Sequence, residues 1–76
     1  MDKTLYDMLK TSAEADKAKA LLSLELLGNK AVGIGDHSTE DFYKNAEEAL
    51  VKLVEADDRL DTLEEYFELQ VKKKVI

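Results

Sequence analysis

Apolar residues recur at helical spacing in both halves of the chain, on either side of a glycine-containing stretch. From Thr4 to Leu27 they follow the three- and four-residue steps of an amphipathic helix, with Asp16 as an interruption. The main stripe holds Leu5, Leu9, Ala13, Ala20, Leu24 and Leu27, and a second stripe beside it holds Met8, Ala15 and Leu22. The spacing predicts a first helix over about residues 3–27.

This first helix becomes apolar around most of its circumference near its end. The segment "ALLSLELL", residues 20–27, presents more apolar surface than one partner helix can cover. We expect the following loop or a second chain to cover it. Leu22 and Leu26 are therefore predicted to lie in an interface between chains.

The second half of the chain carries the most regular pattern. Apolar residues alternate in steps of four and three over nearly four heptads, which predicts a helix over about residues 39–72. These seam residues are Phe42, Ala46, Ala49, Leu53, Ala56, Leu60, Leu63 and Phe67. The alanines allow a neighbouring helix to approach closely, and Leu50 and Val54 widen the apolar face beyond a simple zipper. We predict that this seam is an oligomer interface.

Charged residues beside the seam allow two interpretations. Some base–acid pairs are five residues apart, the spacing of contacts between chains in a parallel coiled coil, and others are four apart, in the order that stabilises a single helix. The former are Lys52 with Asp57 and Arg59 with Glu64, and the latter are Glu48 with Lys52 and Glu55 with Arg59. The pattern leaves both open.

The stretch between the helices has signals for a stop and a start. Gly28 is placed where a left-handed residue ends a helix, and Ser38 is placed to cap the next one. We therefore predict a loop over residues 28–38. Together these elements predict an all-α fold in one domain, an antiparallel helical hairpin. Because 76 residues bury only a small core, we expect the hairpin to assemble into a homo-oligomeric bundle, a dimer or larger.

The same loop is a candidate ligand site. "GIGDHST" precedes a helix N-terminus and could present backbone N–H groups to an anion, although its spacing matches no established phosphate-binding fingerprint. The candidate residues are Gly33, Gly35, Asp36, His37, Ser38 and Thr39. A structural turn explains most of these residues, and one histidine without a second imidazole or a thiolate is a poor metal site. We expect no metal, no cofactor and no enzymatic activity.

Charge and composition narrow the partners. The net charge is −6, and residues 39–71 hold 11 acids against 3 bases, which disfavours a nucleic-acid-binding face. The cluster Lys72–Lys74 suits the negative end of a helix dipole. A mimic of nucleic acid is a third possibility, with acids standing in for phosphates. Its candidate residues are Glu47, Glu48, Glu55, Asp58, Asp61, Glu65 and Glu68.

The chain has no cysteine and no apolar run of the roughly 18 residues that cross a bilayer. We expect a soluble, cytoplasmic protein that does not enter a membrane.

The runs "VGIGDHSTEDFYKNAEEAL" and "VEADDRLDTLEEYF" resemble small helical proteins encoded by tailed bacteriophages, especially those that infect marine cyanobacteria. The resemblance spans roughly residues 20–67 and implies a phage origin and action in the host cytoplasm. It carries no established activity. We therefore expect an interaction module that acts on a host or phage protein. The alternative is a binding protein for an anionic nucleotide or signalling metabolite, using the GIGDHST loop.

Overall fold

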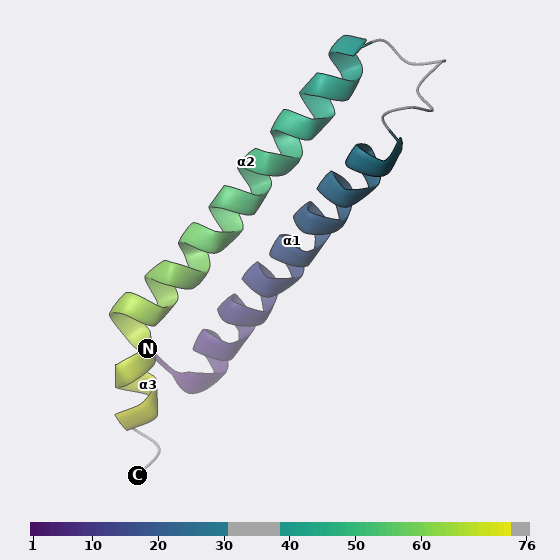
Figure 1. Ribbon diagram of the computed structural model, residues 1–76. Coiled ribbons are helices and arrows are strands. Elements are labelled where there is room, and N and C mark those ends of the chain that lie inside the picture. The colour runs from purple at the N-terminus through teal and green to yellow at the C-terminus, as the bar shows by residue number, and fades with distance from the viewer. Residues whose placement is uncertain (31–38, 74–76) are drawn as a thin grey trace.

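The computed structural model describes residues 1–30 and 39–73 and is helical throughout these ranges except at Met1 and Asp2. Helix α1 (Lys3–Lys30) runs up one side and helix α2 (Thr39–Leu63) returns beside it, followed by a π-helix, η2 (Glu64–Glu68), and the short helix α3 (Leu69–Lys73) (Figure 1). This confirms the predicted all-α hairpin of two packed antiparallel helices. The hairpin is long and thin, with extents of 58 × 14 × 14 Å.

Side chains of the first residues begin helix α1. The carboxylate of Asp2 accepts hydrogen bonds from the backbone N–H groups of Thr4 and Leu5, at 3.1 and 3.3 Å. These bonds satisfy two donors that have no partner inside the helix. Helix α2 begins with Glu40 and Asp41 in its first turn, where acids stabilise the positive end of the dipole. Acidic side chains therefore stabilise the N-terminal ends of both long helices.

The end of α1 corrects the predicted boundary at Leu27. Helix α1 continues through Gly28 to Lys30, and Gly28 does not have a positive φ. Gly28 is an exposed residue inside α1, and the helical turn that contains it needs no left-handed residue. Glycine inside a helix costs only about 1 kcal/mol relative to alanine, and the helix continues in spite of it.

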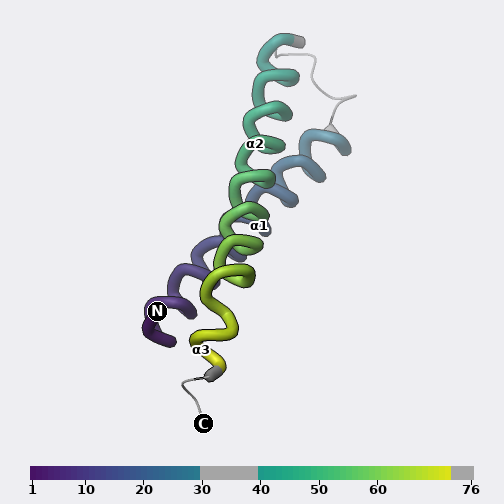
Figure 2. Tube along the Cα trace, turned by 90° about the vertical axis from the view of Figure 1, so that its left-hand side faces the viewer, coloured from purple at the N-terminus to yellow at the C-terminus, as the bar shows by residue number. Residues whose placement is uncertain are grey.

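The core between α1 and α2 is narrow because it consists mainly of alanine. Among the described residues, the buried hydrophobic side chains are Tyr6, Ala13, Ala20, Ala49, Ala56, Leu63 and Val71. Ala13 and Ala56 are fully inaccessible to solvent. Figure 2 shows that the two helices cross at an angle. Small residues at the contact let the helices approach closely, as the alanines of the predicted seam indicated.

Tyr6 differs from the expected stripe. Leu5 was predicted to face the partner helix, but it is 45% exposed whereas Tyr6 is 6% exposed. Tyr6 is seven residues before the buried Ala13, which is itself seven before Ala20. A step of seven residues keeps a side chain on the seam between two helices, so Tyr6 faces α2 as Ala13 does. Leu5 is two steps of four before Ala13, and this spacing turns its side chain away from the seam.

The π-helix adjusts the seam at its far end. Ala49, Ala56 and Leu63 are spaced by seven, but the next buried residue, Val71, comes eight after Leu63. A π-helix accommodates one extra residue per turn, so η2 supplies this additional position. Val71 thereby joins Tyr6 in one cluster with Leu63. The heptad pattern alone predicted an uninterrupted helix over 39–72 and missed η2.

Candidate interaction surface

Two ion pairs join α1 to α2 on opposite flanks of the alanine contact. Arg59 Nη2 lies 2.6 Å from Asp16 Oδ2, and Lys17 Nζ lies 2.9 Å from Asp57 Oδ1. Asp57 and Arg59 are two residues apart, which is about 200° around a helix. Their side chains therefore point to opposite flanks of the contact between α1 and α2. Asp16, which interrupts the apolar stripe in the sequence, therefore has a structural role. Neither predicted set of charge pairs anticipated these cross-helix contacts.

The ion pairs shift the proton affinities of their members. The hydrogen bond from Arg59 lowers the pKa of Asp16 below its usual value of 3.8, although partial desolvation opposes the effect. The hydrogen bond to Asp57 raises the pKa of Lys17 above its usual value of 10.5. Both shifts favour the charged forms of Asp16 and Lys17. The four side chains are 42–47% exposed, so solvent screens the attraction within each ion pair. We therefore expect the two pairs to fix how α1 and α2 align along each other more than to add stability.

A groove follows one face of the hairpin between α1 and α2. Its larger section has a volume of about 950 Å³ and extends toward the loop end, with Leu22, Leu26 and Leu27 among its lining residues. A smaller section of about 330 Å³ lies near Leu9. Arg59 lines both sections, so its ion pair with Asp16 lies between them. We call this surface the groove face.

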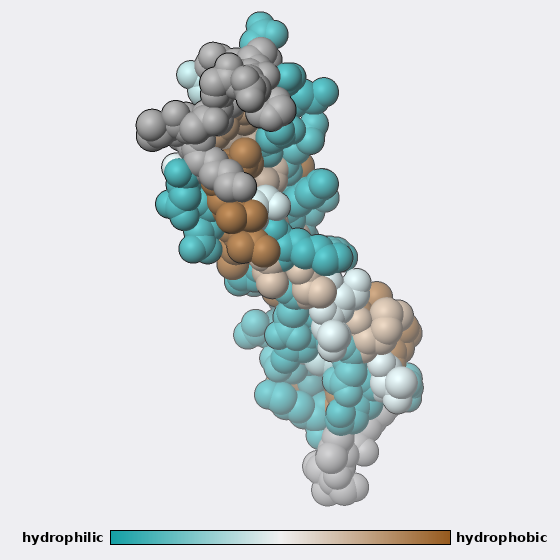
Figure 3. Space-filling view, turned by 90° about the vertical axis from the view of Figure 1, so that its right-hand side faces the viewer, coloured by the Kyte–Doolittle hydropathy of each residue, from teal (hydrophilic) through white to brown (hydrophobic). Residues whose placement is uncertain are grey.

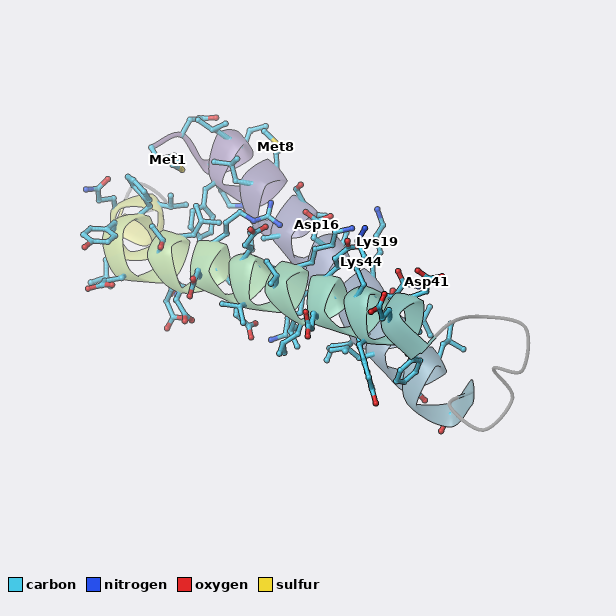
Figure 4. The ribbon with its side chains drawn as sticks, turned by 90° about the horizontal axis from the view of Figure 1, so that it is seen from above. Met1, Met8, Asp16, Lys19, Asp41 and Lys44 are labelled. Atoms are coloured by element: carbon cyan, nitrogen blue, oxygen red, sulfur yellow. The ribbon has the colours of Figure 1, made fainter. Side chains whose placement is uncertain are left out.

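Charges on the groove face are balanced, unlike those of the whole chain. Its larger section has three acids and three bases, namely Asp16, Glu48, Glu55, Lys19, Lys52 and Arg59. In Figure 4, Asp16 and Lys19 of α1 and Asp41 and Lys44 of α2 lie along the same side of the hairpin. The larger section of the groove face therefore carries no net charge on a chain whose net charge is −6, and the smaller section adds Asp58.

Large apolar side chains are exposed along both helices. Leu22 is 55% exposed and Leu26 is 46% exposed, at the edge of the groove. Figure 3 shows hydrophobic residues gathered near the end of the hairpin where residues 31–38 connect the helices. A second exposed row is on α2 and contains Tyr43, Leu50 and Val54. In the described part of the chain, the packing of α1 against α2 therefore leaves these large apolar side chains exposed.

The predicted interface residues fall into two groups. The seam residues of α2 face α1 within one chain: Ala49, Ala56 and Leu63 are buried, and Phe42, Ala46, Leu53, Leu60 and Phe67 are half-buried. The seam thus forms the contact inside the hairpin. By contrast, Leu22 and Leu26 are exposed, as residues available to a second chain must be.

The predicted ligand loop lies almost entirely outside the described residues. Gly33, Gly35, Asp36, His37 and Ser38 are not described, and Thr39 is the first residue of α2. Within residues 1–30 and 39–73, no group of three or more acids, histidines or cysteines is arranged to hold a metal ion. The same ranges contain no helix that is long and apolar enough to cross a membrane.

The acids proposed to mimic phosphates do not form one face. Glu48 and Glu55 line the groove together with Lys52 and Arg59, and Glu68 lies 3.5 Å from Lys72. The exposed Glu47, Asp61 and Glu65 line neither section of the groove. Outside the groove the hairpin has a strip of carboxylates along α2 and η2, in which Asp61 interacts electrostatically with Lys17.

Comparison with family models finds no match to this chain, and neither curated proteins nor solved structures match it.

Proposed function

We propose that this chain is a non-enzymatic interaction module, which self-associates through its exposed apolar surface and presents an acidic strip to a partner protein. The observation that carries the proposal is the exposure of large apolar side chains in the described residues. Leu22 is 55% exposed, Leu26 is 46% exposed and Leu50 is 52% exposed. Association with a further chain would bury such side chains.

The composition of the core supports self-association. Four of the seven buried hydrophobic residues in the described ranges are alanines, and no large side chain there is fully buried. Alanine contributes little apolar area, so packing within one hairpin provides little hydrophobic stabilisation. The leucines that could provide more, such as Leu22 and Leu26, face outward. A further chain would bury them.

The acidic strip supports docking on a partner with a basic surface. Of the three bases within residues 39–71, Lys52 and Arg59 line the groove, whereas the acids Glu47, Asp61 and Glu65 lie outside it. An acidic patch steers a basic partner and increases the rate of encounter. The resemblance to phage-encoded proteins suggests a host or phage protein in the host cytoplasm as this partner.

Affinity capture from a cyanobacterial lysate tests the docking step. Immobilised wild-type chain should retain a specific protein, and the variant E47K/E65K should lose it. The variant E14K/E25K makes the same change of charge on α1 and should retain it, since it leaves the acidic strip intact. Equal capture by all three chains, or none, contradicts the proposal. Native mass spectrometry that finds a stoichiometric nucleotide-sized adduct would instead favour the ligand-binding alternative.

A further inference from the structure

We infer that a second copy of this chain packs against the groove face, so that two hairpins form a four-helix bundle around a two-fold axis. This inference rests on the self-association proposed above and names the surface that performs it. Each copy would place Leu22 and Leu26 beside the groove of the other. An interface built from the same patch on both chains closes at two copies.

The choice of face follows from the two exposed apolar rows. Leu22 and Leu26 border a concave surface that also contains Leu27, Ala20 and Ala49. Leu50 and Val54 are on the other flank of α2, because Leu50 follows the buried Ala49 by one residue whereas the groove residue Glu48 precedes it. Neither Leu50 nor Val54 lines either section of the groove. Concave apolar surface accepts side chains from a partner better than a convex row does.

The distribution of charged residues also favours the groove face over the other flank. Asp57 and Asp61 continue the row of Leu50 and Val54 at steps of three and four, and Glu47 precedes it. Lys17 pairs with Asp57 on that flank, but Glu47 and Asp61 of two copies meeting there would still bring like charges together. In the larger section of the groove face three acids and three bases are interspersed, so a two-fold partner can place bases opposite acids there. An acidic chain can therefore pair with itself there without net repulsion.

The length of the hairpin suits such a pair. A standard interface buries about 800 Å² on each partner. The hairpin is 58 Å long and 14 Å in each of its other two dimensions, so the groove face is a long surface that both helices border. Two such faces packed together have the cross-section of a four-helix bundle.

Sedimentation equilibrium of matched variants tests the inference. Wild-type chain should have twice its mass of 8.6 kDa. The variant L22E/L26E should associate at least ~100-fold more weakly, because two buried apolar contacts become charges. The variant L50E/V54E removes two exposed apolar residues and adds the same charge on the other flank. It should remain a dimer. Circular dichroism should show all three chains equally helical, since the four residues are exposed in the single hairpin.

The outcomes separate the two proposals. A wild-type chain that stays monomeric overturns both the groove-face dimer and self-association itself. A wild-type dimer that L50E/V54E disrupts and L22E/L26E does not overturns the choice of face only, as does a wild-type assembly larger than two copies.

A thiol probe covers the case in which L22E/L26E unfolds. The chain contains no cysteine, so S23C and T11C each carry a single thiol. Ser23 lines the groove, and Thr11 is about 120° away around α1. Association should slow the reaction of the S23C thiol several-fold and leave T11C unchanged. Equal reactivity at protein concentrations above and below dimerisation overturns the inference.

Discussion

Arg59 Nη2 donates a hydrogen bond to Asp16 Oδ2 at 2.6 Å, which joins residues 43 positions apart in the sequence. The contact crosses the seam on the groove face, and Lys17 with Asp57 crosses on the opposite flank at 2.9 Å. Alanine contacts between helices allow neighbouring registers at similar cost, because small side chains interlock weakly. We interpret the two ion pairs as the contacts that select one register for the hairpin.

Exchanging the charges of the first pair tests this role. The variants D16R and R59D should each lower the midpoint of urea denaturation, because each places like charges across the seam. The double variant D16R/R59D should recover most of the loss. The double-mutant cycle measures the coupling between the two positions. If the double variant is as unstable as the two losses combined, the pair does not select the register.

Stability should depend on pH through the same contacts. The pKa of Asp16 is lowered in the folded chain, so its contribution is present above the usual value of 3.8 and is lost as the pH falls through the folded-state value. The difference in stability between wild type and D16N should therefore be full at pH 7 and shrink in strong acid. A difference that stays constant down to pH 2 contradicts the assignment.

Lys17 behaves with the opposite sign. Its pKa is raised in the folded chain, so its contribution is present below the usual value of 10.5 and is lost as the pH rises through the folded-state value. The variant K17M should narrow its gap to wild type only in strong base. Urea denaturation of D16N and K17M across the whole pH range therefore distinguishes the contribution of the Asp16–Arg59 pair from that of the Lys17–Asp57 pair.

Gly28 should accept a side chain. An added Cβ would meet nothing within 4 Å, and Gly28 does not have a positive φ. Replacing glycine by alanine inside a helix stabilises it by roughly 0.5–1 kcal/mol. We expect the variant G28A to gain this much in thermal or urea denaturation. A loss of about 1 kcal/mol would show that Gly28 is a left-handed cap, as its position near the loop first predicted.

Much of the hairpin could be predicted from the sequence because its seam follows a strict heptad pattern. Ala49, Ala56 and Leu63 face α1 as that pattern indicated. The pattern did not identify which partner the seam contacts, since packing within a chain and between chains requires the same residues. Leu22 and Leu26 of α1 are exposed because Ala13 and Ala20 are the residues of that helix buried against α2.

The missed features depend on contacts that distant segments make. Tyr6 and Val71 belong to one cluster although 65 residues separate them, and no local spacing signals that pairing. The cross-helix partner of Asp16, Arg59, is also distant, at 43 positions along the chain. Among the candidate ligand residues of the loop, only Thr39 falls in the described ranges, so the loop's role remains a prediction.

The π-helix provides a test of the seam. Deleting Glu65 would remove the extra residue and place Val71 seven positions after Leu63, so a regular α-helix would still bury it. We expect this variant to keep its helical content and to unfold at a urea concentration close to that of wild type. Deleting the exposed Val51, between the buried Ala49 and Ala56, should destabilise the chain strongly because nothing restores the spacing. Equal effects of the two deletions contradict this account of η2.

The most direct test of self-association is the dependence of unfolding on protein concentration. If a second copy completes the core, stability rises with concentration, by about 2.8 kcal/mol per dimer for a hundredfold increase. Urea denaturation of the wild-type chain should therefore have a clearly higher midpoint at about 100 µM than at about 1 µM. An unchanged midpoint, with the chain fully helical at both concentrations, would show that the single hairpin is stable alone and would contradict the account.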